Sequence, residues 1–89
     1  MTSFVWTPGF KRSYKKRILI DPALKQKFEE TLFLFSQNPF ETKLQTHKLS
    51  GKLKDYWACT VDYDTRIIFR LISPKEVLLL DIGSHDEVY

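Results

Sequence analysis

The sequence predicts an α+β fold in which an N-terminal strand and two helices pack on one face of an antiparallel β-sheet. Three observations support this. Apolar residues recur at helical spacing between residues 8 and 37, three β-rich runs follow between residues 56 and 82, and turn residues separate those runs. At 89 residues the chain has room for one domain, so we expect residues 1–89 to form a single unit. Its 43% hydrophobic content is enough for a core without disulfides.

The first half of the chain carries a strand signal and two helix signals. Residues 4–6, FVW, favour a short strand, and the pairs Thr7-Pro8 and Asp21-Pro22 each place a capping residue before a proline suited to the first helical position. Each helix then shows an apolar stripe, with Phe10, Tyr14 and Ile18 in the first and Leu24, Phe28, Leu32 and Phe35 in the second. Asn38-Pro39 ends the second helix, and a long connection follows up to about residue 54.

The second half predicts an antiparallel meander. Its runs are YWACTVDY (56–63), RIIFRLI (66–72) and EVLLLDI (76–82), and Asp64-Thr65 and Ser73-Pro74 lie between them. Side chains alternate between the faces of a strand, which assigns the more apolar face to the helices and leaves Thr60, Arg66 and Arg70 on a partly open face. The last run is apolar on both sides, as expected of a central strand.

Composition limits the kinds of chemistry. Cys59 is the single cysteine and His47 and His85 are the only histidines, so the sequence predicts neither a disulfide nor a metal site, and no cofactor is expected. With no long apolar span or leader pattern, we expect a cytoplasmic protein without a membrane partner. Residues 1–27 hold seven basic and one acidic residue, a net charge of +6, against −3 for the rest, from seven basic and ten acidic residues. This basic segment favours anionic partners.

Three segments together resemble a known family. HKLSGKL (47–53), YDTRIIF (63–69) and GSHDEVY (83–89) are similar to the RelE/ParE superfamily of toxins from type II toxin–antitoxin systems, most of all to its RelE- and YafQ-like branch. The resemblance covers essentially the whole chain. It implies a RelE-like fold and an endoribonuclease that cuts messenger RNA on the ribosome without a metal, until a cognate antitoxin neutralises it.

The resemblance also implies roles for particular residues. His85 matches the histidine of the YafQ-type motif and is expected to be the general acid or base, a task suited to imidazole near neutral pH. Arg66 matches the strand arginine of RelE-type toxins and is expected to bind the phosphate and stabilise its charge. Tyr89 matches the final aromatic residue, for stacking or proton transfer. His47 and Asp64 match two further YafQ positions and complete the catalytic candidates.

Several of these residues also fit simple structural roles. Arg66 can pair with Asp62 or Asp64, Asp64 can be an ordinary turn residue, and His47 can be a simple loop residue. The expected RNA-binding residues are basic and lie in the first helix, the long connection and one strand: Lys11, Lys15, Lys48, Lys52, Lys54 and Arg70. A solvated surface accounts for them equally well.

The chain departs from the family at three positions, and two alternatives remain. Thr60 stands where YafQ-like toxins carry histidine and Thr65 where they carry tryptophan, and neither Ala58 nor Thr60 is the lysine of RelE. A ParE-like toxin that binds gyrase and a catalytically weak homologue that serves as an antitoxin-binding or autoregulatory module therefore compete with the ribonuclease. The expected partners are the antitoxin and messenger RNA on the ribosome, with ribosomal RNA contacts and no direct DNA contact.

Overall fold

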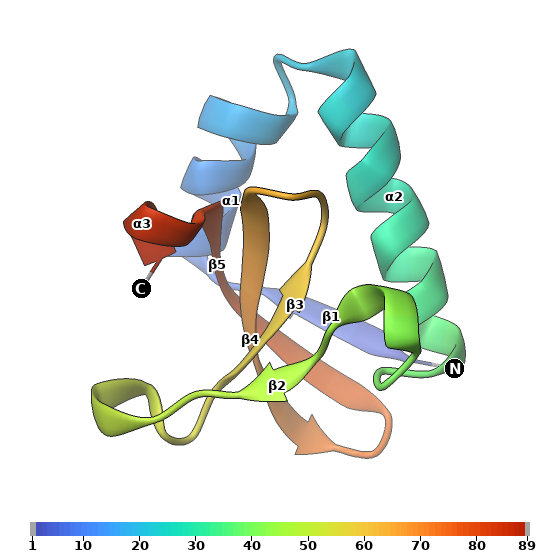
Figure 1. The fold of residues 1–89 in the computed structure, drawn as a ribbon, viewed down its shortest axis with the longest axis vertical. Coiled ribbons are helices and arrows are strands. Elements are labelled where there is room, and N and C mark those ends of the chain that lie inside the picture. Colours follow the sequence, from blue (N-terminus) through green and yellow to red (C-terminus); the bar gives the residue numbers. More distant parts are fainter. Residues whose placement is uncertain (1, 89) are drawn as a thin grey trace.

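The computed structural model describes residues 2–88, with the backbone alone at position 87. Five strands and three α-helices are joined by short 3-10 and π-helical turns (Figure 1). In chain order they are β1 (Ser3–Trp6), α1 (Pro8–Ser13), a π-helical turn (Tyr14–Ile18), α2 (Pro22–Gln37), a 3-10 turn (Thr42–Leu44), β2 (His47–Lys48), a second 3-10 turn (Gly51–Leu53), β3 (Trp57–Thr60), β4 (Thr65–Ser73), β5 (Glu76–Ser84) and α3 (His85–Val88). No helix among these residues has the length and apolarity needed to span a bilayer.

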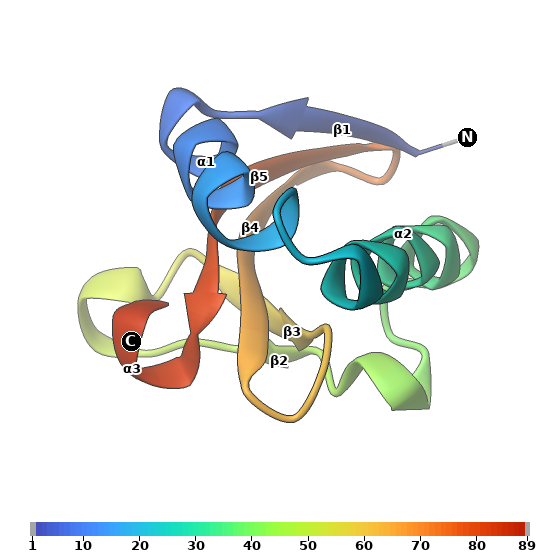
Figure 2. The same cartoon turned by 90° about the horizontal axis from the view of Figure 1, so that it is seen from above.

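The five strands form one mixed sheet in the order β1-β5-β4-β3-β2. Strands β2 to β5 pair antiparallel, which confirms the predicted meander, and β5 is a central strand as its apolar faces predicted. The sequence did not predict the pairing of β1, which lies parallel to β5. β1 and β2 are therefore the two edges of the sheet, on opposite sides of the molecule in Figure 2.

Both helices begin at the predicted capping residues. The hydroxyl of Thr7 accepts a hydrogen bond from the N–H of Phe10 at 3.1 Å and donates one to the carbonyl of Leu79 at 2.9 Å, so the cap also fixes α1 against β5. A carboxylate oxygen of Asp21 accepts from the N–H of Leu24 at 3.1 Å. The first helix differs from the prediction in its second half, where the N–H of Leu19 bonds to the carbonyl five residues earlier and the turn becomes π-helical.

The core lies between the helices and one face of the sheet. Its fully buried aromatic residues are Phe10 from α1, Phe28 and Phe35 from α2 and Phe69 from β4. The rings of Phe35 and Phe69 meet edge to face at 4.8 Å. Other members and neighbours of the core confirm the predicted sorting of the sheet faces: Trp57, Cys59, Val61, Ile67 and Leu71.

The opposite face is less open than predicted. Ala58 and Ile68 point to this side, yet both are at most 1% exposed. A hollow of about 380 Å³ over Ile68 is also lined by Leu53 and Val88, so the loop before β3 and the short helix α3 partly cover this face.

Two local predictions were wrong. The run 56–63 is not one strand, because β3 ends at Thr60 and residues 61–64 form a tight connection to β4. The last strand does not end at Ile82 as predicted but continues through Gly83 and Ser84, which pair with the start of β4: Arg66 lies opposite Gly83 and Thr65 opposite Ser84. These pairs bring the C-terminal segment alongside the start of β4.

Candidate active site

Arg66 is mounted on the second residue of β4 and flanked by strands on both sides. Its Cα pairs with Thr60 on β3 and with Gly83 on β5. The guanidinium folds back over the β3–β4 loop, where Nη1 donates to the carbonyls of Asp62 at 2.7 Å and Thr65 at 3.2 Å, and Nη2 donates to the carbonyl of Tyr63 at 3.1 Å. The alternative that Arg66 simply pairs with a carboxylate is not what the geometry shows, since these bonds go to main-chain oxygens.

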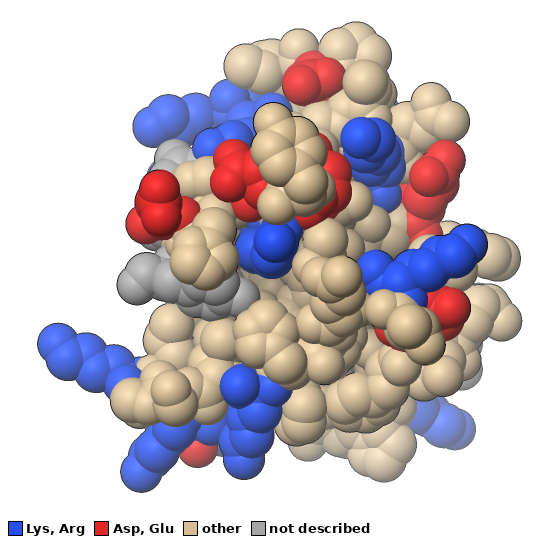
Figure 3. Space-filling view, in the orientation of Figure 1, with Lys and Arg blue, Asp and Glu red and all other residues tan. Residues whose placement is uncertain are grey.

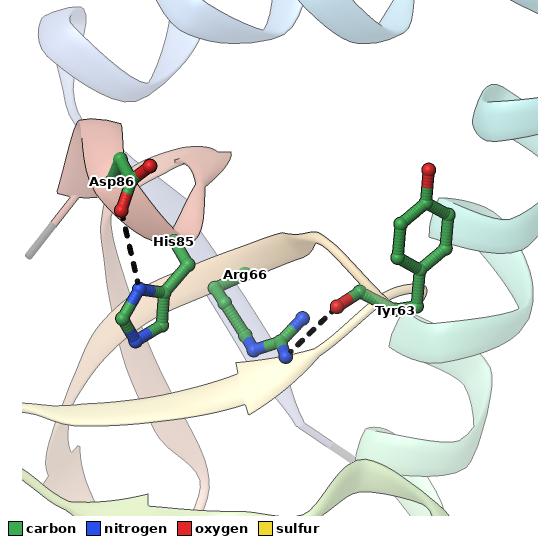
Figure 4. A network of polar contacts seen from close by, with 4 residues as sticks. All are labelled: Tyr63, Arg66, His85 and Asp86. Carbon is green, nitrogen blue, oxygen red and sulfur yellow. Dashed lines mark hydrogen bonds and ion pairs between the residues drawn. The ribbon is translucent and has the colours of Figure 1, made fainter.

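His85 lies beside this arginine. Its N–H donates to the carbonyl of Asp64 at 3.0 Å, which fixes the first residue of α3 to the loop that precedes β4. The imidazole is 60% exposed, and its Nδ1 lies 3.7 Å from a carboxylate oxygen of Asp86. Figure 4 shows the His85 and Arg66 side chains extending on the same side of the strands, with Arg66 between His85 and Tyr63.

The β3–β4 loop is held in shape by Asp62. One of its carboxylate oxygens accepts from the N–H of Asp64 at 2.9 Å and from the N–H of Thr65 at 2.6 Å, a turn in which an aspartate binds the backbone ahead of it. Partial burial alone would raise the pKa of Asp62, but these hydrogen bonds outweigh that effect and lower it. The Asp62 carboxylate thus holds the loop backbone in the conformation whose carbonyls accept hydrogen bonds from Arg66.

The other catalytic candidates are placed differently. Asp64 lies in the same loop and contributes its carbonyl to His85. His47 is on β2 and pairs with Ala58 on β3, so it lies about 10 Å across the sheet from β4. Its Nδ1 is 3.0 Å from the carbonyl oxygen of Gln45. Tyr89 lies outside the described residues. The structure therefore groups Arg66, His85 and the backbone of Asp64, and leaves His47 apart.

The candidate site is an exposed surface rather than a closed pocket. The nearby hollow of about 490 Å³ is lined by Thr60 and Tyr63, which are neighbours of Arg66, together with residues of α2 and the first 3-10 turn. A second hollow, of about 370 Å³, lies beside His47 and Lys48. Such an open arrangement can bind a phosphate and exchange a proton.

The basic residues expected to bind RNA are all exposed, in three separate places. Lys11 and Lys15 lie on the first helix and its π-helical turn, and Arg70 lies two residues beyond Ile68 on β4. Lys48, Lys52 and Lys54 belong to β2 and the loop after it. Figure 3 shows Lys and Arg side chains projecting at the lower left of this face, and further Lys and Arg side chains among the Asp and Glu side chains of its upper half.

The described residues offer no competing metal or thiol chemistry. No group of three or more His, Cys, Asp or Glu residues among them is placed to bind a metal ion. Burial raises the pKa of Cys59 to about 12, although the nearby Arg66 charge opposes the shift, so the thiol stays protonated and unreactive at neutral pH.

Sequence reasoning missed the two loop residues that shape this site, Asp62 and Tyr63. The apolar pattern predicted both residues within a strand that ran to residue 63. The available signal was Asp62 itself, because an aspartate side chain often accepts hydrogen bonds from the N–H groups two and three residues later and so forms a turn. Tyr63 is 92% exposed at the tip of the loop, and its carbonyl accepts from Arg66.

Comparison with known proteins decides the family. Residues 2–89 match the sequence profile of the YafQ family, described as bacterial toxins of type II toxin–antitoxin systems. The chain belongs to this family. No curated protein sequence matched the toxin.

Solved structures support the RelE-like fold of the toxin. A Helicobacter pylori toxin, crystallised as a copper-bound mutant, is 27% identical over 100% of both chains, with a TM-score of 0.75. Escherichia coli YafQ is 20% identical over 100% of this chain and 99% of its own, with a TM-score of 0.73. A YoeB/ParE toxin from Agrobacterium tumefaciens is 20% identical over 96% of this chain and 99% of its own, with a TM-score of 0.79. The predicted α+β fold and superfamily are confirmed.

Proposed function

We propose that the toxin is a metal-independent endoribonuclease that cuts messenger RNA on the ribosome. The observation that supports this most is the placement of His85 and Arg66, an imidazole and a guanidinium on the same side of adjoining elements (Figure 4). In-line cleavage of RNA requires a group that moves protons and a cation at the phosphate, and these two side chains supply both.

The reaction follows from these roles. A base takes the proton of the 2′-hydroxyl, the 2′-oxygen attacks the neighbouring phosphorus, and the bond to the 5′-oxygen breaks as that oxygen gains a proton. The products are a 2′,3′-cyclic phosphate and a 5′-hydroxyl. Arg66 binds the phosphoryl oxygens as their charge grows, and its three hydrogen bonds to main-chain carbonyls, two in the β3–β4 loop and one at Thr65, hold it in place beforehand, so little reorganisation is needed. His85 transfers one of the two protons.

The remaining proton transfer requires a second group. Asp64 and Tyr89 are the candidates nearest in sequence to His85 and Arg66, and His47 is further across the sheet. At the strand position directly opposite Arg66, Thr60 replaces the histidine of YafQ-like toxins and its hydroxyl donates to the amide oxygen of Gln45 at 3.4 Å. The open site and the reduced set of proton-transfer groups both favour an enzyme that depends on the ribosome to hold its substrate.

The partner expected from the family is a cognate antitoxin in the cytoplasm. Structures of the Escherichia coli DinJ–YafQ complex and the Staphylococcus aureus YoeB–YefM complex contain chains of the same fold. In this toxin the basic residues 1–27 include Lys11, Lys15 and Lys16, all exposed, which suit an acidic antitoxin segment and, in its absence, ribosomal RNA.

Expression followed by mapping of RNA ends tests the function. We expect the wild-type toxin to arrest growth and produce new 5′-hydroxyl ends in translated messages. His85→Ala and Arg66→Ala should each lower cleavage by about 100-fold or more, while Lys75→Ala, at the exposed turn between β4 and β5, should not.

Two results would contradict the proposal in different ways. Growth arrest with intact RNA would favour the gyrase-binding alternative. Tight antitoxin binding without arrest or cleavage would favour the antitoxin-binding module, for which the replacement at Thr60 is the supporting observation.

A further inference from the structure

Tyr63 carries its ring on a rigid part of an otherwise exposed loop. The ring is 92% exposed, which alone would mean little, because single exposed apolar groups are common on protein surfaces. Its backbone, however, is bound on both sides: Arg66 donates to the carbonyls of Asp62 and Tyr63, and the Asp62 carboxylate accepts from the N–H groups of Asp64 and Thr65. An ordered backbone lowers the entropy lost when the ring engages a ligand.

This mounting links Tyr63 directly to the phosphate-binding candidate. The Arg66 guanidinium donates to the carbonyl of Tyr63 at 3.1 Å. The guanidinium and the ring therefore both lie next to the backbone of this one residue. Figure 4 shows the ring pointing away from His85, on the far side of Arg66. A nucleotide whose phosphate binds Arg66 can therefore extend its base toward Tyr63.

A hollow lies next to this ring. It has a volume of about 490 Å³, within the range of sites for small ligands, and is bounded by Tyr63, the first 3-10 turn and α2. Four charged residues line it, the basic Lys27 and Lys43 and the acidic Glu30 and Asp62. Because the two carboxylates offset the two ammonium groups, the hollow attracts a phosphate weakly and suits an uncharged base.

We propose that Tyr63 is a stacking platform for the nucleobase next to the phosphate bound by Arg66, and that the hollow between α2 and the β3–β4 loop receives this base. The inference rests on the proposed function of the toxin, and adds a residue that determines how the substrate strand is placed. Single-stranded RNA is commonly recognised through bases that stack on exposed aromatic side chains, which tolerates many sequences because every base has a flat face.

Binding of an uncleavable strand tests this separately from catalysis. The probe is a five-nucleotide oligodeoxyribonucleotide, which lacks the attacking 2′-hydroxyl, titrated into the full-length toxin while the aromatic proton resonances are recorded by NMR. We expect the Tyr63 ring resonances to shift upfield on binding. Tyr63→Ala should weaken the affinity by about 5- to 30-fold, and Tyr63→Trp should retain it.

Phe33→Ala is the matched control, because Phe33 is also an exposed aromatic residue, at 65%, and does not line this hollow. It should leave the affinity unchanged. Tyr63 resonances that do not move, or equal affinities for wild type and Tyr63→Ala, would overturn the inference. A loss of antitoxin affinity in Tyr63→Ala with unchanged oligonucleotide affinity would also overturn it, by making this surface part of the antitoxin interface.

The outcomes separate the two proposals. A wild-type toxin that cleaves translated messages but shows no Tyr63 response keeps the ribonuclease proposal and removes this inference. A Tyr63 response in a toxin that never cleaves RNA removes the ribonuclease proposal, and keeps Tyr63 only as a residue that binds nucleobases.

Discussion

Replacement of Asp62 tests whether its carboxylate holds the β3–β4 loop in the conformation that binds the Arg66 guanidinium. The Asp62 carboxylate accepts hydrogen bonds of 2.9 and 2.6 Å from two backbone N–H groups, and Asp62→Ala removes both acceptors. Hydrogen bonds to a charged acceptor contribute about 1.5–3 kcal/mol each, but this side chain is only partly buried, so we expect a total loss of about 1–2 kcal/mol. For a domain of this size that lowers the melting temperature by about 4–15 °C.

Two variants separate charge from geometry. Asp62→Asn keeps an oxygen acceptor of the same shape and should lose about half as much stability as Asp62→Ala. Asp64→Ala removes a carboxylate of the same loop that accepts neither of these bonds, and should change stability by less than about 0.5 kcal/mol. Urea denaturation followed by tryptophan fluorescence measures all three.

The pH dependence has a defined sign. Because the folded-state pKa of Asp62 lies below the ordinary value of 3.8, its charge contributes stability that is complete above that pH and is lost as the pH falls through the folded pKa. The difference between wild type and Asp62→Asn should therefore disappear in strong acid. Equal losses in Asp62→Ala and Asp64→Ala, or a difference from Asp62→Asn that persists in acid, would show that the Asp62 carboxylate does not hold the loop through these two bonds.

Two further predictions concern the core. Phe69→Ala should destabilise the toxin by about 3–5 kcal/mol, because Phe69 is fully buried against Phe35. Phe33→Ala, on the outer surface of α2, should lower the free energy of unfolding by less than about 0.5 kcal/mol, and urea titrations compare the two variants. Cys59 should react with a thiol reagent at pH 8 only as fast as the chain unfolds, and because its folded pKa is raised to about 12, stability should fall as the pH rises above about 9. Fast labelling of native protein would show that the thiol is accessible.

The sequence predicted the parts of the fold that depend on local chemistry. Thr7 and Asp21 are strong caps followed by proline, and β4 and β5 alternate clearly, so the helix starts and the meander were predictable. The parallel pairing of β1 was not, because it depends on how the helices return the chain to the sheet. Nor was the π-helical turn, since Tyr14 and Ile18 show the same four-residue spacing as a regular helix.

The sequence indicated Arg66 and His85 as candidate side chains of the site, but not the loop conformation that holds the guanidinium. Arg66 and His85 were identified by resemblance, and the register that places Arg66 opposite Gly83 explains why they are neighbours. The simple structural alternative for Arg66 was pairing with a carboxylate, whereas the guanidinium donates to main-chain carbonyls of the loop that Asp62 holds in shape. The atoms that Arg66 contacts depend on the conformation of the β3–β4 loop. That loop was not predicted, because the apolar pattern continues to residue 63 and so indicated a strand where the turn lies.

Cleavage of a ribosome-bound message by purified toxin is the decisive test of whether His85 and Arg66 form a ribonuclease site. The measurement is the rate at which new 5′-hydroxyl ends form on a translating ribosome, compared between wild type, His85→Ala, Arg66→Ala and Arg66→Lys at matched folded fractions. The proposed mechanism predicts losses of about 100-fold or more for both alanine variants and only partial rescue by lysine, because an ammonium group has too few N–H donors to bond three carbonyls and a phosphate together. Wild-type rates in His85→Ala and Arg66→Ala would contradict it.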